Sequence, residues 1–235
     1  MSARIRSVDL ENPFHPSLEG MCEVLLVRHG EQEYTESISM GDALDAPLSD
    51  LGRRQAAAVG ERLAGTEIHA VYSSTLQRAR DTGAAIGAHH GLTPTEHHDL
   101  REIDLWRDFP QDKGLLDVYS EQELVAIFRA GHQTRRWDAY PHTEPAEEFQ
   151  GRVLASIDEI IAAHHGERVV VACHGGVINT VLAHVLRSTI DNLVKVHHTS
   201  ITTVRGADER RVAISVNDYS HVLPIQDAVN PLNLH

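Results

Sequence analysis

The stretch EVLLVRHGE, residues 23–31, joins a short apolar run rich in branched side chains to a charged end. A short run that is apolar throughout and ends near a glycine is typical of a strand buried on both faces. It predicts a buried strand that opens into a loop, with Arg28 and His29 at its carboxyl end. Gly30 lacks a side chain and therefore lets another segment approach the loop closely.

Strand and helix signals alternate along the rest of the chain. Ser49 can cap a helix that Gly65 ends, and a second strand is predicted over residues 68–72. The later elements are predicted as a helix over 76–90, a third strand ending at 100–102, helices over 120–130 and 149–161, a strand over 169–173, a helix over 177–186, and an edge hairpin of strands 201–204 and 212–216. This alternation predicts an α/β fold, a three-layer α/β/α sandwich around a largely parallel sheet in which an edge strand can be antiparallel. In such sheets ligands bind beyond the carboxyl ends of the strands.

The length of the chain accommodates one domain. Of its 235 residues, 41% are hydrophobic, which is sufficient for one core of ordinary size. We expect a single domain over residues 21–223. Residues 105–147 are less regular and are expected to form a helical cap inserted over the rim of the sheet. Residues 1–20 are interpreted as an extended arm and residues 224–235 as a tail.

The composition excludes several classes of partner. A formal net charge of −13 argues against nucleic acid or an anionic membrane, because both need dispersed lysines and arginines. Residues 1–20 contain no continuous apolar run and fit neither a signal peptide nor a membrane-spanning helix. Cys22 and Cys173 lack CxxC spacing and a secretory context, so a cytoplasmic location is expected. The 17 histidines include no HExxH motif and no His/Cys cluster, and neither a metal nor another cofactor is expected.

Four short motifs carry chemically active side chains at or just after predicted strand ends. They are RHG at 28–30, SSTLQRA at 73–79, LRE at 100–102 and HGG at 174–176. Each motif alone is weak, but the ordered combination is specific and resembles the histidine phosphatase superfamily, in its cofactor-dependent phosphoglycerate mutase branch. The resemblance spans about residues 23–222. It includes NDYSHV at 217–222, which is similar to a segment after the last strand of many members and is interpreted as structural.

The resemblance implies phosphoryl transfer through a phosphohistidine. The roles it assigns are His29 as the nucleophile, Glu102 as the proton donor, and Arg28, Arg78, His174 and Gly175 as phosphate-binding residues. The residue types suit this chemistry on their own. A neutral imidazole can attack phosphorus when its second nitrogen donates to a backbone carbonyl and so fixes the tautomer. Guanidinium groups stabilise the phosphoryl oxygens without a metal, and a carboxylic acid protonates the leaving alkoxide.

Two further expectations concern charge near the nucleophile. A bound phosphate should raise the pKa of His174, because a nearby anion favours the imidazolium. Glu31 lies two residues beyond His29 and could act as the acid. The simpler interpretation is a loop carboxylate that hydrogen-bonds nearby backbone, so Glu31 is left out of the catalytic set.

Departures from the family pattern bear on the reaction. Mutases usually carry His-Gly-Asn where this chain has HGG at 174–176, which favours a phosphatase acting on a small phosphorylated substrate. Arg135 and Arg136 resemble a substrate-binding pair of the mutases, so a phosphoglycerate-type mutase is the alternative. A third hypothesis is a phosphate-binding protein without catalysis, which the retention of all four motifs disfavours. The irregular region 105–147 leaves the substrate open, and the edge hairpin and the cap helix offer surfaces for a homodimer.

Overall fold

The computed structural model describes residues 18–33, 44–208 and 210–225. Within these residues the strands form one six-stranded sheet in the order β3-β2-β4-β1-β5-β6. The strands are β1 Cys22–Arg28, β2 Ala70–Ser74, β3 Thr95–His97, β4 Arg168–Cys173, β5 Ile201–Ala207 and β6 Arg210–Asp218. β1 and β4 run parallel, as do β2 with β4 and β2 with β3. β5 is antiparallel to both β1 and β6, so the reversed strand lies one position inside the edge.

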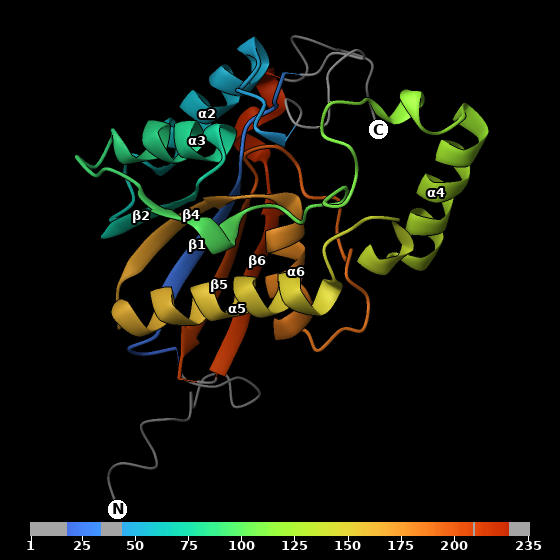
Figure 1. Cartoon of the computed structure of the whole chain (residues 1–235). Helices are drawn as coiled ribbons and strands as arrows, with labels where there is room; N and C mark the ends of the chain where they lie inside the picture. Colours follow the sequence, from blue (N-terminus) through green and yellow to red (C-terminus); the bar gives the residue numbers. More distant parts are fainter. Residues whose placement is uncertain (1–17, 34–43, 209, 226–235) are drawn as a thin grey trace, which may run out of the picture.

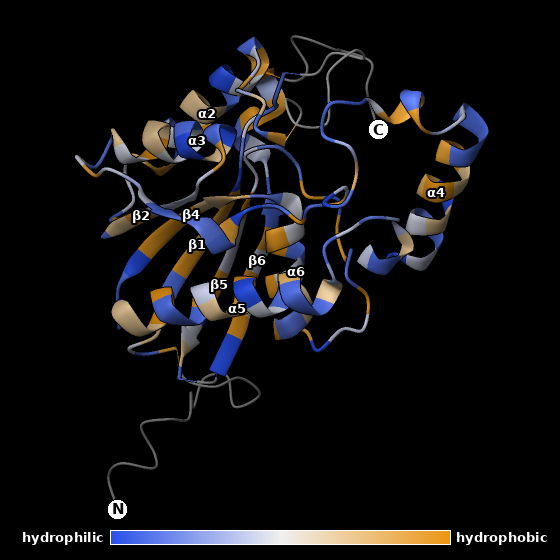
Figure 2. Ribbon diagram, viewed as in Figure 1, coloured by the Kyte–Doolittle hydropathy of each residue, from blue (hydrophilic) through white to orange (hydrophobic). Residues whose placement is uncertain are grey.

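Helices cover both faces of the sheet, which confirms the predicted three layers (Figure 1). On one face lie α2 Asp50–Leu63 and α3 Gln77–Gly87, and on the other lie α5 Ala146–Ala163 and α6 Gly175–Val185. The side chains of β1 alternate between the two cores. Val24 and Leu26 pack with the α5 and α6 side chains, whereas Leu25 and Val27 pack with those of α2 and α3. In Figure 2 the central strands are coloured mostly apolar, whereas α2, α3 and α5 mix polar and apolar residues along their length.

The helix starts follow the capping signals in the sequence. The Ser49 hydroxyl accepts from the Gly52 N–H and begins α2. Ser120 and Glu123 form a capping box at the start of α4, Glu121–Thr134. None of the helices in the described part of the chain is long and apolar enough to cross a bilayer.

The region between β3 and α5 contains the short helices η1 His98–Leu100, η2 Leu115–Asp117 and η3 Trp137–Ala139 together with α4. Its described residues add no strand to the sheet, and α4 lies to one side of the sandwich (Figure 1). The predicted arm, residues 1–20, and the predicted tail, residues 224–235, fall almost entirely outside the described residues.

The prediction that the third strand ends at residues 100–102 is wrong. β3 ends at His97, and the backbone then turns through η1, where the Arg101 N–H donates to the His98 carbonyl at 3.1 Å. The turn buries Leu100 completely in the core beside α5. Glu102 therefore follows a tight turn and not a strand end. The predicted edge hairpin is confirmed by β5 and β6.

Candidate active site

The sheet brings three of the four motifs to one edge. β2, β4 and β1 are neighbours, and their carboxyl ends carry the motifs beginning at Ser73, His174 and Arg28. Arg28 pairs with Cys173 in the β1–β4 register, so His29 and His174 leave the sheet side by side. Their ring centroids are 5.0 Å apart. Arg78 lies in the first turn of α3, directly after β2.

His29 is 4% exposed, and both of its ring nitrogens are engaged. The Gly30 carbonyl can only accept a hydrogen bond, so Nδ1, at 2.7 Å from it, carries the proton and donates. Such a bond to a backbone carbonyl is the condition for attack through the other ring nitrogen. Nε2 then holds the lone pair and accepts from Arg78 Nε at 3.2 Å. Burial, together with the charges on Arg78 and Arg28, holds the pKa of His29 well below its usual value, so the ring stays neutral.

Gly30 fits the loop because another backbone comes very close to it. A Cβ atom at this position would lie 2.5 Å from the carbonyl oxygen of Gly52 on α2. The Gly30 N–H donates to Thr82 Oγ1 at 3.1 Å, which ties the loop to α3 as well. The Glu31 carboxylate accepts from the Ser49 hydroxyl at 2.8 Å. The Glu31 carboxylate thus binds a side-chain hydroxyl at the start of α2 and not the nearby backbone that was expected.

Two guanidinium groups lie beside His29. Arg78 is 5% exposed and also donates to the Leu44 carbonyl at 2.8 Å. Arg28 donates through Nη1 to the Val196 carbonyl, while its buried Nε has no hydrogen-bond partner among the described residues. A buried N–H of a cation without a partner is costly unless a ligand supplies an acceptor. Arg28 Nε therefore fits an anion-binding group.

His174 is fully buried and is oriented by Ser74. Ser74 Oγ accepts from the Leu76 N–H at 3.2 Å, and among the described contacts of this hydroxyl only His174 Nε2, at 2.9 Å, can accept its proton. In this arrangement the proton of the neutral ring is on Nδ1, which is buried and has no partner within the described chain. Burial and then the charges of Arg78 and Arg28 hold the pKa of His174 well below its usual value. The expected rise in this pKa depends on a bound phosphate.

Glu102 reaches the site from the segment after η1. Its Oε2 accepts from the Gly176 N–H at 3.0 Å, and its Oε1 accepts from the Ile103 N–H at 3.0 Å. A Cβ atom at Gly175 would lie 3.9 Å from both Arg28 Nε and Glu102 Oε2. The arginine and the carboxylate therefore lie on the same side of Gly175. The six residues with assigned roles come together at this site: Arg28, His29, Arg78, Glu102, His174 and Gly175.

Arg152 on α5 fixes the backbone that carries Glu102. Its guanidinium donates to the carbonyl oxygens of Asp99, Arg101 and Glu102 at 2.7, 2.8 and 3.2 Å. Three acceptors from one short segment, bound by one rigid fork, determine where that segment lies. None of the sequence motifs pointed to this role of Arg152.

His198 is a site neighbour that the motifs did not identify. Its ring centroid is 5.8 Å from that of His29, and burial followed by the charges of Arg28 and His197 lowers its pKa to about 3. The next residue, Thr199, is fully buried with φ +55°, a strained backbone for a β-branched residue. This conformation directs its N–H to the Arg28 carbonyl at 2.9 Å.

The NDYSHV segment, residues 217–222, binds residues 195–197, which directly precede His198. Asn217 Oδ1 accepts from the His197 N–H at 2.9 Å, and its Nδ2 donates to the Lys195 carbonyl at 3.0 Å. The rings of His197 and Tyr219 stack with centroids 3.9 Å apart. The structural interpretation of the segment is therefore confirmed.

Arg135 and Arg136 are engaged elsewhere. Arg135 ends α4 in a left-handed conformation and donates to the carbonyl oxygens of Asn192 and Leu193. Arg136 donates to the Thr189 carbonyl at 3.0 Å and lies 3.4 Å from the buried carboxylate of Asp191. Both guanidiniums connect the α4 region to residues 189–193. The pair that resembles a mutase substrate-binding pair is thus held by backbone carbonyls and by Asp191.

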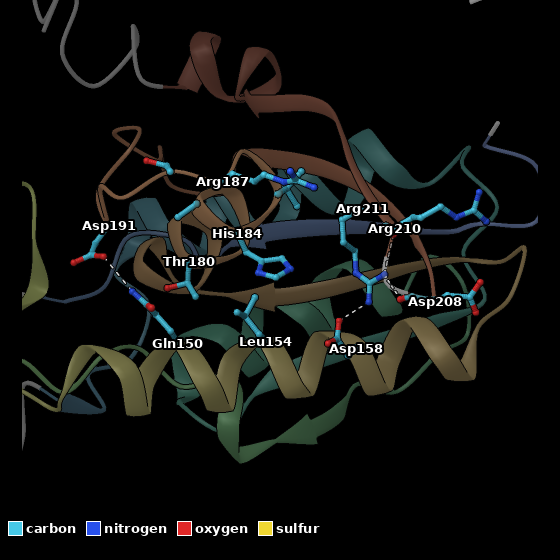
Figure 3. A pocket seen from close by; sticks show the side chains of 13 residues that line it. Gln150, Leu154, Asp158, Thr180, His184, Arg187, Asp191, Asp208, Arg210 and Arg211 are labelled. Atoms are coloured by element: carbon cyan, nitrogen blue, oxygen red, sulfur yellow. Dashed lines mark hydrogen bonds and ion pairs between the residues drawn. The ribbon is translucent and has the colours of Figure 1, made fainter. Parts of the chain in front are cut away.

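A groove of about 850 Å³ lies between α5, the later turns of α6 and the β5–β6 turn (Figure 3). None of the six site residues lines it. Arg211 forms an ion pair with Asp158 across the groove, and Asp191 accepts from Gln150 at 3.1 Å. Asp158, Asp191 and Arg211 of the groove are thus paired, in contrast to Arg28 Nε and His174 Nδ1. In the described part of the chain no three His, Cys, Asp or Glu side chains are grouped so that they could hold a metal ion.

Comparison with known proteins identifies the family of this chain. Residues 24–219 match the sequence profile of the histidine phosphatase superfamily, branch 1. Phosphoglycerate mutase-like protein 4 of Arabidopsis thaliana is 34% identical over 206 residues, which cover 85% of this chain and 86% of that protein. The metal-independent phosphoserine phosphatase of Arabidopsis thaliana is 29% identical over 204 residues, which cover 85% of this chain and 83% of that protein. A solved structure of mycobacterial glucosyl-3-phosphoglycerate phosphatase is similar with a TM-score of 0.66 and 27% identity, covering 83% of this chain and 98% of that one. The chain belongs to the histidine phosphatase superfamily.

Proposed function

We propose that this protein is a phosphatase that hydrolyses a small phosphomonoester through a phosphohistidine on His29. The state of the His29 ring is the observation that carries the proposal. Nδ1 is committed to the Gly30 carbonyl, so the lone pair is on Nε2, beside the Arg78 guanidinium. A neutral imidazole in this position is suited to attack the phosphorus of a bound monoester.

In the first step Nε2 of His29 attacks phosphorus and the ester P–O bond breaks. Arg28, Arg78, His174 and the Gly175 backbone stabilise the charge on the phosphoryl oxygens. Glu102 transfers its proton to the leaving oxygen, which departs as an alcohol. In the second step the Glu102 carboxylate takes a proton from water, the oxygen of that water attacks phosphorus, and the N–P bond breaks to release inorganic phosphate.

Hydrolysis is favoured over a mutase reaction. Relatives of this chain are named as phosphatases of phosphoserine and of glucosyl-3-phosphoglycerate. Arg135 and Arg136, which the mutase alternative would use, bind backbone carbonyls instead. The gathering of nucleophile, acid and cations also disfavours a binding protein without catalysis. The proposed substrate class is a small alkyl phosphomonoester.

We propose that the reaction needs no metal or other cofactor, because Arg28, Arg78 and His174 supply the charge stabilisation. The segment 105–147 is proposed to cap the site and contact the leaving group, as part of one domain over 21–223 with an arm over 1–20 and a tail over 224–235. A homodimer through the β6 edge is supported by Ile214 and Val216, which are 45% and 41% exposed. A cytoplasmic location is supported by Cys22 and Cys173, which are both buried and unpaired.

Substitution of Glu102 by Gln tests the proposed chemistry. For an alkyl phosphate, whose leaving alkoxide is strongly basic, we expect single-turnover phosphorylation to slow by about 10²- to 10⁴-fold. A nitrophenyl phosphate needs little protonation, so its phenolate burst should stay fast while later turnover slows. Both Glu102 oxygens accept backbone N–H groups, so Gln can satisfy only one of them. Equal burst defects for the two substrates would indicate impaired phosphate binding and contradict the acid role.

Substitution of Glu31 by Gln is the matched control. Glu31 lies close to His29 in the chain, but its carboxylate is bound to Ser49. This variant should retain alkyl phosphatase activity. A large alkyl-specific defect in Glu31→Gln, with none in Glu102→Gln, would assign the proton to Glu31.

A further inference from the structure

The first turn of α6 contains two glycines, and only the second lies against the Glu102 carboxylate. A Cβ atom at position 176 would lie 3.1 Å from Glu102 Cδ and closer still to Oε1, well inside contact distance. At Gly175 a Cβ atom would lie 3.9 Å from Glu102 Oε2, an ordinary contact. The carboxylate therefore occupies space that a side chain at position 176 would fill.

Backbone conformation does not account for the glycine at 176. Gly20, Gly91 and Gly166 have positive φ angles, but Gly176 is not among these and lies in regular helix. Alanine could adopt the same backbone, and glycine within a helix is about 1 kcal/mol less favourable than alanine. The helix alone therefore disfavours glycine here, and the need for space explains its presence.

The amide of Gly176 also holds the carboxylate. N–H groups in the first turn of a helix have no intrahelical acceptor, and His174 at the start of α6 makes no side-chain capping bond. Glu102 Oε2 supplies the acceptor for Gly176 from a residue 74 positions earlier. Because Oε1 is bound to the Ile103 N–H, the carboxylate can rotate only by breaking one of these bonds.

We infer that Gly176 is a positioning residue, whose missing side chain and backbone N–H together place the Glu102 carboxylate for proton transfer to the leaving group. The inference rests on the proposed role of Glu102 as the proton donor. In this chain a side chain at position 176 would displace the Glu102 carboxylate, so we expect a larger residue there to impair esters of basic alcohols most, because their leaving oxygen needs the proton.

The test compares Gly176→Ala with the wild type over a series of phosphate esters. The single-turnover rate is measured against the pKa of the leaving alcohol or phenol. We expect a loss of about 10²-fold for alkyl phosphates, a change below about threefold for nitrophenyl phosphate, and hence a steeper dependence on leaving-group pKa. Equal losses for all esters would overturn the inference.

A matched control addresses crowding in general. A Cβ atom at Gly176 would also lie 3.3 Å from Phe149 Cζ, a tight contact. Gly83→Ala on α3 reproduces this crowding, because its Cβ would lie 3.3 Å from that of Ala172, with no carboxylate nearby. Gly83→Ala should leave the leaving-group dependence unchanged. If it steepens the dependence as much as Gly176→Ala does, crowding explains the effect and the inference fails.

A double-mutant comparison separates this inference from the proposed function. In a Glu102→Ala background the carboxylate is gone, so adding Gly176→Ala should cause no further loss on alkyl phosphates. If Glu102→Ala is strongly defective and Gly176→Ala adds a further loss, only the role of Gly176 is wrong. If Glu102→Ala shows no alkyl-specific defect, the acid role and the inference are both wrong. If Gly176→Ala alone does not fold, the double variant should fold, because the carboxylate that the new side chain would contact is gone. A double variant that also does not fold would overturn the inference.

Discussion

Arg152 binds the carboxylate of Glu144 through two parallel hydrogen bonds, from Nε to Oε1 at 2.7 Å and from Nη2 to Oε2 at 2.8 Å. Glu144 is 5% exposed. Burial acts to raise the pKa of Glu144, but the hydrogen bonds and charge of Arg152 outweigh it and hold that pKa below its usual value. The same guanidinium holds the carbonyl groups around Glu102, so this ion pair anchors the segment that carries the proposed acid.

Substitution of Arg152 by Met is expected to lower the free energy of unfolding by about 3 kcal/mol, because Glu144 is left buried without its partner. Urea unfolding measures this change. Arg107→Met is the control, since Arg107 forms an exposed pair with Glu148, and it should change the urea midpoint little. Equal midpoints for the Arg152 and Arg107 variants would contradict the anchoring role.

Ser74 is expected to act through His174. In Ser74→Ala the ring loses the hydrogen bond at Nε2, so the proton is no longer held on Nδ1, and kcat/KM should fall about tenfold, the equivalent of about 1.4 kcal/mol. Ser73→Ala is a close control, because Ser73 is equally buried and its hydroxyl has no partner among the described residues. Nitrogen NMR of His174 reports the tautomer directly. An unchanged His174 spectrum in Ser74→Ala would count against this assignment.

Three buried neutral histidines, His29, His174 and His198, make stability depend on pH. Their pKa values in the folded protein lie below the usual value of about 6.5, so the unfolded chain binds more protons once the pH falls below that value. Their contribution is complete above about pH 6.5 and is lost as the pH falls, by up to about 1.4 kcal/mol per pH unit for each histidine.

The unfolding free energy should therefore decrease as the pH falls from about 6.5 to about 5. His198→Asn should make this decrease smaller, by up to about 1.4 kcal/mol per pH unit. Urea titrations across this range measure the slope. His165→Asn removes an exposed histidine and should leave the slope as in the wild type. A slope that is identical in His198→Asn and the wild type would show that His198 is not held neutral by folding.

With 3-phosphoglycerate and a bisphosphate primer, we expect release of inorganic phosphate to be faster than conversion between phosphoglycerate isomers. Arg135 and Arg136 are bound to backbone carbonyls and cannot hold a second substrate without rearrangement. Product analysis by phosphorus NMR distinguishes the two reactions. Faster isomer conversion would restore the mutase alternative.

Much of the site could be predicted because strand ends are local signals. The apolar run before Arg28 and the one before His174 each identify a buried strand, and parallel neighbours place their carboxyl ends together. Ser49 and Ser120 identified their helices for a similar reason, since a cap depends on residues only three positions away.

The features that could not be predicted depend on contacts between distant residues. Glu102 follows a turn and is placed by Gly176 and Arg152, neither of which is near it in sequence. His198 lies beside His29 because β5 runs antiparallel to β1, so the start of one strand meets the end of the other. The sequence of Arg135 and Arg136 could not reveal that backbone carbonyls bind their charges.

The phosphohistidine on His29 is tested most directly by chemical trapping of the phosphorylated enzyme. Wild-type protein is mixed briefly with a radiolabelled alkyl phosphate and quenched in base, and the phosphorylated residue is identified by mass spectrometry. We expect an acid-labile, base-stable phosphoryl group on His29, and neither adduct nor turnover in a folded His29→Ala variant. Turnover by His29→Ala at the wild-type rate, or a phosphoryl group on any other residue, would contradict this expectation.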